Sequence, residues 1–165
     1  MEIILAQGTA LASRAIGYLT KSIWSHCALR YSIPEDSWVV HATVGGVQPD
    51  WWFYFKHKYT NHLRYKTNIE CADQALDNVV NRLAHAQYDY EGFLGQGLAI
   101  AIGLRKNPIG SSHNYRCTEL ITAWIDEVKK LDPSIDLPHV DSELATPGGL
   151  ADYCDMHSKY FEKVI

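Results

Sequence analysis

The chain has 165 residues, of which 47% are hydrophobic and 21% are charged, and its formal net charge is −4 at pH 7. This length suits one domain with a substantial core, and the composition excludes a disordered chain. A nucleic-acid-binding protein needs a basic surface, which a net negative charge does not favour. We therefore expect a single domain over residues 1–165 and no nucleic-acid partner.

The start of the chain does not resemble a secretory signal. Glu2 stands where basic residues are usual, and the apolar residues 3–6 are followed at once by Gln7 and Gly8. The longest apolar stretch, residues 94–104, is shorter than the ~18 residues of a membrane span. We expect no transmembrane segment, and a location in the cytoplasm or release without a classical signal peptide.

Hydrophobic periodicity and turn residues divide the chain into alternating strands and helices. In chain order they predict a strand (3–6), a helix (10–20), a strand (22–31), a turn (33–37), a strand (38–42), a helix (50–59), a strand (63–66), a helix (71–85), a turn (88–92), a helix (94–104), a helix beginning at 117 and ending near 131, a helix beginning after Thr146, and an edge strand (160–165).

Two histidines lie on strands that we expect to pair. The turn at 33–37 is short, so strands 22–31 and 38–42 are predicted to form an antiparallel hairpin that would bring His26 close to His41. Alternation along the first strand places Cys27 on the opposite face from His26. The next helix begins near Asp50, which we expect to be its N-cap.

Cys117 is predicted to stand at the start of an amphipathic helix. Leu120, Ile121 and Trp124 recur at helical spacing behind it, and turn residues precede it. The free N–H groups and the helix dipole at such a position favour a thiolate. A cysteine nucleophile also needs a base and a group that orients the base, and the pair His26 and His41 suits these roles. The four cysteines are far apart and are expected to be free thiols.

Several segments together resemble the circularly permuted NlpC-like branch of the papain-fold cysteine peptidases and amidases. In that branch a histidine strand precedes the cysteine helix. The similar segments are residues 24–29 (WSHCAL), 39–42 (VVHA), 88–92 (YDYEG), 115–121 (YRCTELI) and 145–150 (ATPGGL).

The resemblance implies an α+β, papain-like fold in which an antiparallel sheet or half-barrel packs against the helix beginning at the catalytic cysteine. It implies Cys117 as nucleophile, His26 as general base and His41 as the orienting residue, where this branch often has glutamate. The backbone N–H of Cys117 and one further donor would hold the oxyanion, and Tyr88, Tyr90 and Asn114 are candidates for that donor. No cofactor is implied.

The implied reaction is acyl transfer through a thioester, and three functions are compatible with it. The first is a peptidase or amidase acting on peptidoglycan-type peptides, as many proteins of this branch do. The second is a lipid-directed thiol acyltransferase or hydrolase, because the same arrangement is similar to lecithin:retinol acyltransferase-like proteins. The third is a non-catalytic binding module. A zinc site made by Cys117, His26 and His41 is a weaker alternative, since no short ligand spacing supports it.

Overall fold

The computed structural model describes residues 1–32, 38–43, 45–83, 87–88 and 114–164. Strands and helices alternate along most of this length. In chain order the elements are β1 (Glu2–Gly8), α1 (Leu11–Thr20), β2 (His26–Arg30), β3 (Trp38–Thr43), β4 (Gly46–Trp51), α2 (Trp52–Lys58), β5 (Tyr59–Thr67), α3 (Ala72–Leu83), β6 (Gln87–Tyr88), β7 (Asn114–Tyr115), α5 (Cys117–Leu131), α6 (Pro147–Met156) and β8 (Phe161–Val164).

The main sheet has six strands in the order β4-β3-β2-β1-β5-β8, and all neighbouring strands are antiparallel. The centre is β1, which pairs with β2 on one side and β5 on the other. Its residues Ile3 to Ala6 are almost completely buried, as expected for a strand covered on both faces. The short strands β6 and β7 form a separate parallel pair.

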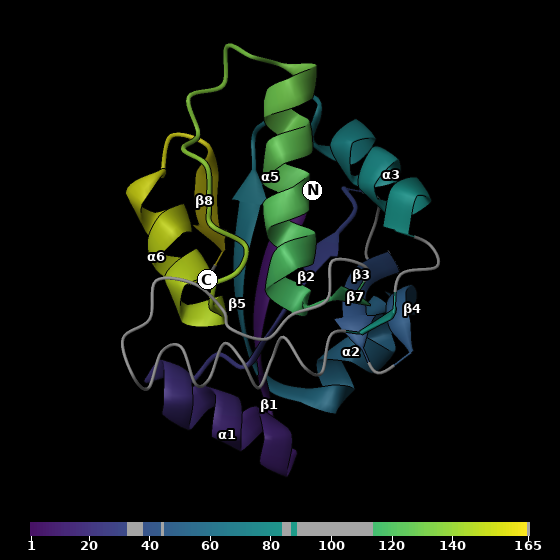
Figure 1. Cartoon of the computed structure of the whole chain (residues 1–165), viewed down its shortest axis with the longest axis vertical. Helices are drawn as coiled ribbons and strands as arrows, with labels where there is room; N and C mark the ends of the chain where they lie inside the picture. Colours follow the sequence, from purple (N-terminus) through teal and green to yellow (C-terminus); the bar gives the residue numbers. More distant parts are fainter. Residues whose placement is uncertain (33–37, 44, 84–86, 89–113, 165) are drawn as a thin grey trace.

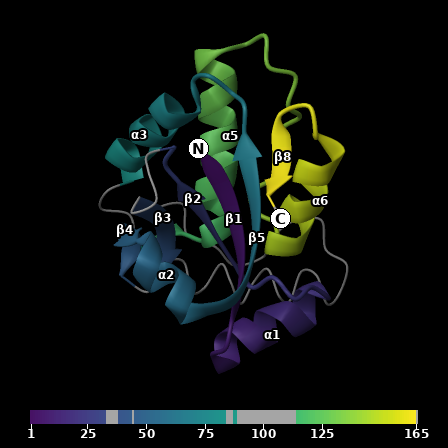
Figure 2. The ribbon, with the colours of Figure 1, turned by 180° about the vertical axis from the view of Figure 1, so that it is seen from behind.

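Helices cover both faces of this sheet. Figure 1 shows α5 lying along the front of the sheet between α3 and α6, and Figure 2 shows α2 on the opposite side. The alternation along the strands separates two sets of core residues accordingly. Leu5, Cys27 and Leu29 pack with α5, while Ile4 and Ala28 pack with Phe55 of α2.

The helix α5 is held to the protein core along most of its length. Leu120, Ile121, Trp124 and Ile125 are fully buried, and the Trp124 indole N–H donates a hydrogen bond of 3.0 Å to the carbonyl of Ala72. Burying an aliphatic side chain of this size contributes about 1.5–3 kcal/mol. The position of Cys117 at the start of α5 is thus fixed by the packing behind it.

Most of the predicted elements are confirmed. The strands near residues 3, 38, 63 and 160 and the helices beginning near residues 10, 71, 117 and 147 are all present. Thr146 caps α6 by accepting a hydrogen bond of 3.0 Å from the N–H of Gly149, with proline at the first helical position.

Three predictions were wrong in detail. The second strand begins at His26 rather than at residue 22. Residues 46–51, where no strand was predicted, form β4. Asp50 therefore belongs to β4 and does not cap α2, which starts two residues later after Trp51. The predicted turn at 33–37 and the predicted helix at 94–104 lie outside the described residues.

Candidate active site

Cys117 is the first residue of α5, and contacts of its neighbour Arg116 fix the helix end that carries it. The Glu119 carboxylate accepts a hydrogen bond of 2.8 Å from the Arg116 backbone N–H. It also forms an ion pair of 2.6 Å with the Arg116 guanidinium. The same guanidinium donates to the carbonyls of Ser142 and Glu143. These contacts join the start of the helix to the segment that leads into α6.

The sulfur of Cys117 faces the first two residues of β2. Hydrogen bonds from the Cys27 thiol, from the His26 ring and from the Cys27 backbone N–H lower the pKa of Cys117 well below its ordinary value, against the opposing effect of burial. The side chain is almost enclosed, with 7% of its surface exposed. Hydrogen bonds to the thiolate favour the charged form.

His26 and His41 lie side by side, as the hairpin prediction required. Nε2 of His26 is 2.9 Å from Nδ1 of His41, and the two rings meet edge to face. One nitrogen of each ring takes part in this contact. Because His26 also contacts the Cys117 sulfur, its imidazole connects the thiol to the second histidine.

Burial keeps His41 neutral. The side chain is completely buried, and desolvation, aided by the nearby charges of His26 and Lys58, lowers its pKa from 6.5 to about 3. A neutral ring that accepts at Nδ1 carries its proton on Nε2. That nitrogen has no hydrogen-bond partner among the described residues, and a carboxylate oxygen of Asp50 is 3.8 Å away. At this distance Asp50 supports the tautomer electrostatically and makes no direct hydrogen bond.

Two aromatic rings from the α2 side form the wall behind the histidines. Tyr59 stacks on His26 with a centroid distance of 4.8 Å and an interplanar angle of 4°, and Phe55 touches both histidine rings. Burial raises the pKa of Tyr59, so it remains a neutral phenol. Neither residue was predicted from the sequence to belong to the site, although their spacing of four places them on one face of the predicted helix.

The structure brings together only part of the predicted oxyanion set. Gln87 pairs with Asn114 and Tyr88 with Tyr115, so the strands carrying the candidates Tyr88 and Asn114 lie next to each other just before Cys117. Tyr90 lies outside the described residues. The choice of the second oxyanion donor stays a prediction.

The zinc alternative finds no support in the part of the chain that the structure describes. No group of three or more histidine, cysteine, aspartate or glutamate side chains there could hold a metal ion. Nε2 of His26 lies 2.9 Å from Nδ1 of His41, so the two nitrogens point at each other. They do not point together at a position where a metal ion could lie.

Cys27 is the main site residue that sequence reasoning assigned differently. It lies on the face opposite His26, as predicted, and is fully buried, and burial together with the Cys117 charge raises its pKa well above the ordinary value. Its contact with Cys117 was not predicted. The thiol is therefore a neutral hydrogen-bond donor to the Cys117 thiolate.

We expect Cys27→Ala to slow the alkylation of Cys117 by iodoacetamide roughly tenfold at about pH 6, because it removes a hydrogen bond to the charged form. Cys27→Ser, which keeps a donor at the same place, should retain most of the rate. Peptide mapping by mass spectrometry measures both. Equal rates for Cys27→Ala and the unchanged protein would show that the thiol contact has no influence on Cys117.

His41 should make the protein less stable in mild acid. Its pKa is about 3 in the folded protein and 6.5 when unfolded, so the unfolded chain binds the proton first as the pH falls. Stability is therefore lost between these two values, by about 2 kcal/mol at about pH 5. Urea unfolding at neutral pH and at about pH 5 measures this loss of unfolding free energy. The loss should be smaller in His41→Asn, and an unchanged loss would show that His41 is not its source.

No protein-family model matches the chain, and no curated protein matches it in sequence. Among solved structures it is similar to the metalloprotein yiiX from Escherichia coli O157:H7, described as DUF1105. The TM-score is 0.55 over 99% of this chain and 86% of that chain, with 14% sequence identity. No described helix has the length and apolar character needed to cross a membrane. The predicted α+β, papain-like fold, with an antiparallel sheet packed against the helix that begins at Cys117, is therefore confirmed.

Proposed function

We propose that this protein is a thiol hydrolase that works by acyl transfer through a thioester on Cys117. The observation that carries the proposal is the chain of contacts from the Cys117 sulfur to His26 and from His26 to His41, the latter at 2.9 Å. A nucleophile, a base and a residue that orients the base are the three parts that such chemistry requires.

His26 takes the proton of the Cys117 thiol, and the thiolate attacks a carbonyl carbon to form a carbon–sulfur bond. The resulting oxyanion is held by the Cys117 backbone N–H at the start of α5, together with a second donor. His26 then gives its proton to the leaving amine as the carbon–nitrogen bond breaks. Water, deprotonated by His26, cleaves the thioester, which releases a carboxylic acid and restores the thiol.

During these steps His41 orients the base. As an uncharged acceptor at Nδ1 it receives the N–H of His26 Nε2, which leaves the other nitrogen of His26 for the sulfur. The low pKa of His41 prevents it from taking the proton itself. This is the role that the sequence analysis gave to His41.

The substrate class that we propose first is a peptide or amide of the peptidoglycan stem type. Its support is the order and spacing of the histidine and cysteine motifs, which resemble the NlpC-like enzymes. The second candidate is the same chemistry on a lipid ester or amide. It is favoured by Phe53 and Tyr54, which are exposed on the helix whose buried Phe55 touches both histidines.

The test is a panel of acyl donors followed by intact-protein mass spectrometry. Peptidoglycan stem peptides and phospholipid esters are offered separately, and an acyl adduct that maps to Cys117 identifies the class. Cys117→Ser, which lacks the thiol but keeps the shape, is the matched control and should remain free of thioester. If neither class acylates Cys117 while the protein binds one of them, the binding-module alternative replaces this proposal.

A further inference from the structure

Large aromatic side chains gather on one part of the surface without being needed for the core. Trp38, Trp51, Phe53 and Tyr54, here called the aromatic surface, are 42%, 45%, 57% and 63% exposed. Single exposed apolar residues are normal on a protein, whereas a group of large ones marks a contact site.

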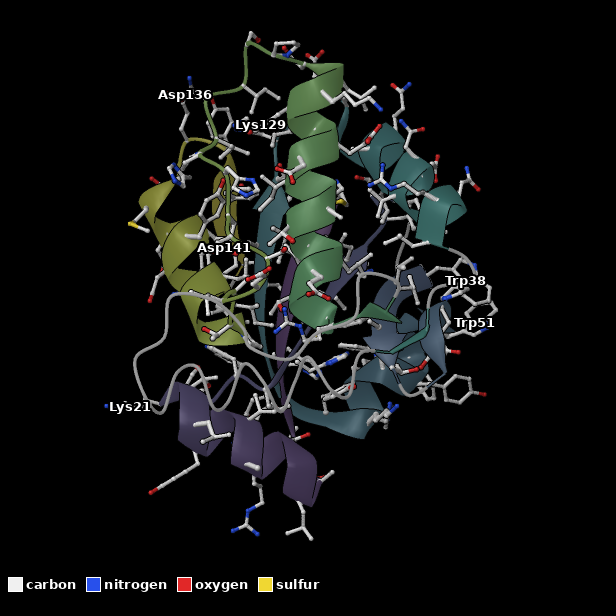
Figure 3. All side chains as sticks on the ribbon, viewed as in Figure 1. Lys21, Trp38, Trp51, Lys129, Asp136 and Asp141 are labelled. Atoms are coloured by element: carbon white, nitrogen blue, oxygen red, sulfur yellow. The ribbon has the colours of Figure 1, made fainter. Side chains whose placement is uncertain are left out.

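The aromatic surface consists of two pairs of rings from segments that follow one another in the chain. Trp38 and Trp51 are directly paired across β3 and β4, with ring centroids 4.5 Å apart, and Figure 3 shows both projecting from the same edge. Phe53 and Tyr54 follow immediately on α2 with their centroids 5.6 Å apart. The helix is anchored from below by Phe55, which is fully buried, so its outer aromatic residues are presented on a rigid support.

Positive charge accompanies these rings. Lys56 and Lys58 are exposed on α2, and the Lys56 ammonium lies 5.6 Å from the centre of the Phe53 ring. Residues 51–58 contain no acidic residue, although the whole chain has a net charge of −4. Asp50, just before this segment, is directed toward His41 at 3.8 Å. The helix α2 therefore carries a charge opposite in sign to that of the whole molecule.

This combination suits one kind of occupant better than others. Tryptophan and tyrosine concentrate at the interface between lipid and water. There the apolar ring contacts lipid, while the polar N–H or O–H stays in contact with water. Lysine adjacent to such residues adds attraction to anionic headgroups. We propose that the aromatic surface, with Lys56 and Lys58, docks the protein on an anionic lipid bilayer. The inference concerns binding only and does not depend on the proposed thiol chemistry.

The test is co-sedimentation with vesicles of phosphatidylcholine alone and of equimolar phosphatidylcholine and phosphatidylglycerol. The protein should bind the anionic vesicles more strongly. The double variant Phe53→Ala/Tyr54→Ala should bind them roughly tenfold more weakly, because two rings no longer enter the interface. Lys56→Glu should weaken binding to anionic vesicles and leave the weak binding to neutral vesicles unchanged.

Two matched controls use residues elsewhere on the surface. Met156→Ala removes another exposed apolar side chain, 73% exposed on α6, and Lys129→Glu reverses a charge on α5 far from Trp38 and Trp51. Both variants should bind as the unchanged protein does, and Cys117→Ser should also bind. Equal losses in the controls, or no binding to anionic vesicles, would overturn the proposal. A concentration-dependent dimer that Phe53→Ala/Tyr54→Ala abolishes, without vesicle binding, would assign the aromatic surface to a protein contact instead.

Discussion

Replacing His26 with alanine is expected to abolish measurable turnover, a loss of at least about 100-fold, because the thiol then has no base to remove its proton. The folded structure should persist. The ring is mostly buried against Tyr59, but it lies where β2 begins and contributes little to the core that α5 forms. Activity assays and thermal unfolding of the same variant measure the two effects together.

His41→Ala is the informative companion to His26→Ala. It removes the residue that orients the base but leaves the base itself, so the loss of activity should be smaller. Purely structural histidines would give the opposite pattern, with lowered melting temperatures and normal activity in the protein that remains folded. That pattern in His26→Ala would remove the general base from the account.

Replacing Arg116 with alanine is expected to cost about 3–5 kcal/mol of unfolding free energy. The residue is 3% exposed, and its guanidinium satisfies Glu119 and the carbonyls of Ser142 and Glu143. Its removal leaves a carboxylate and two carbonyls without their charged partner at the helix end that carries Cys117. Urea unfolding at neutral pH measures the loss.

Lys130→Ala is the control for that measurement. Lys130 also pairs with a glutamate three residues away on α5, but its side chain is 73% exposed. Exposed ion pairs contribute about 0–1 kcal/mol, so this variant should unfold almost as the unchanged protein does. Similar losses in the two variants would show that the Arg116 contacts are no more important than a surface pair.

The elements that could be predicted from the sequence are those in which one local pattern decides the structure. In α5 the apolar residues Leu120, Ile121 and Trp124 repeat at helical spacing, and all three are fully buried. The short connection between the histidine strands likewise predicted that His26 would meet His41, and their ring nitrogens are 2.9 Å apart. Neither prediction needed information from distant parts of the chain.

The strand β4 could not be recognised in this way. It contains Pro49 and Asp50, residues that are unfavourable in strands, and among the described residues it lies at the edge of the sheet and pairs with β3 alone. Its pairing with β3 places Gln48 opposite His41 and brings Asp50 near the buried imidazole. Without β4, the same aspartate looked like a helix cap.

The contact between Cys27 and Cys117 was missed for a different reason. Alternation along β2 correctly places Cys27 opposite His26 in the core, but it does not tell where a helix from another part of the chain begins. Because α5 starts beside the first residues of β2, the Cys117 sulfur contacts both neighbours. The Arg116 contacts with residues 142 and 143 are equally non-local.

The role of Cys117 as the nucleophile is tested most directly by the order in which the four free thiols react with iodoacetamide at about pH 6, where an ordinary thiol is protonated. Cys71 is the most exposed of the four, yet burial raises its pKa, whereas Cys117 is nearly enclosed and its pKa is lowered. We expect peptide mapping to find Cys117 alkylated first, at a rate that changes little from about pH 6 to 8. Alkylation of Cys71 first, with a Cys117 rate that rises tenfold for each pH unit, would contradict this role.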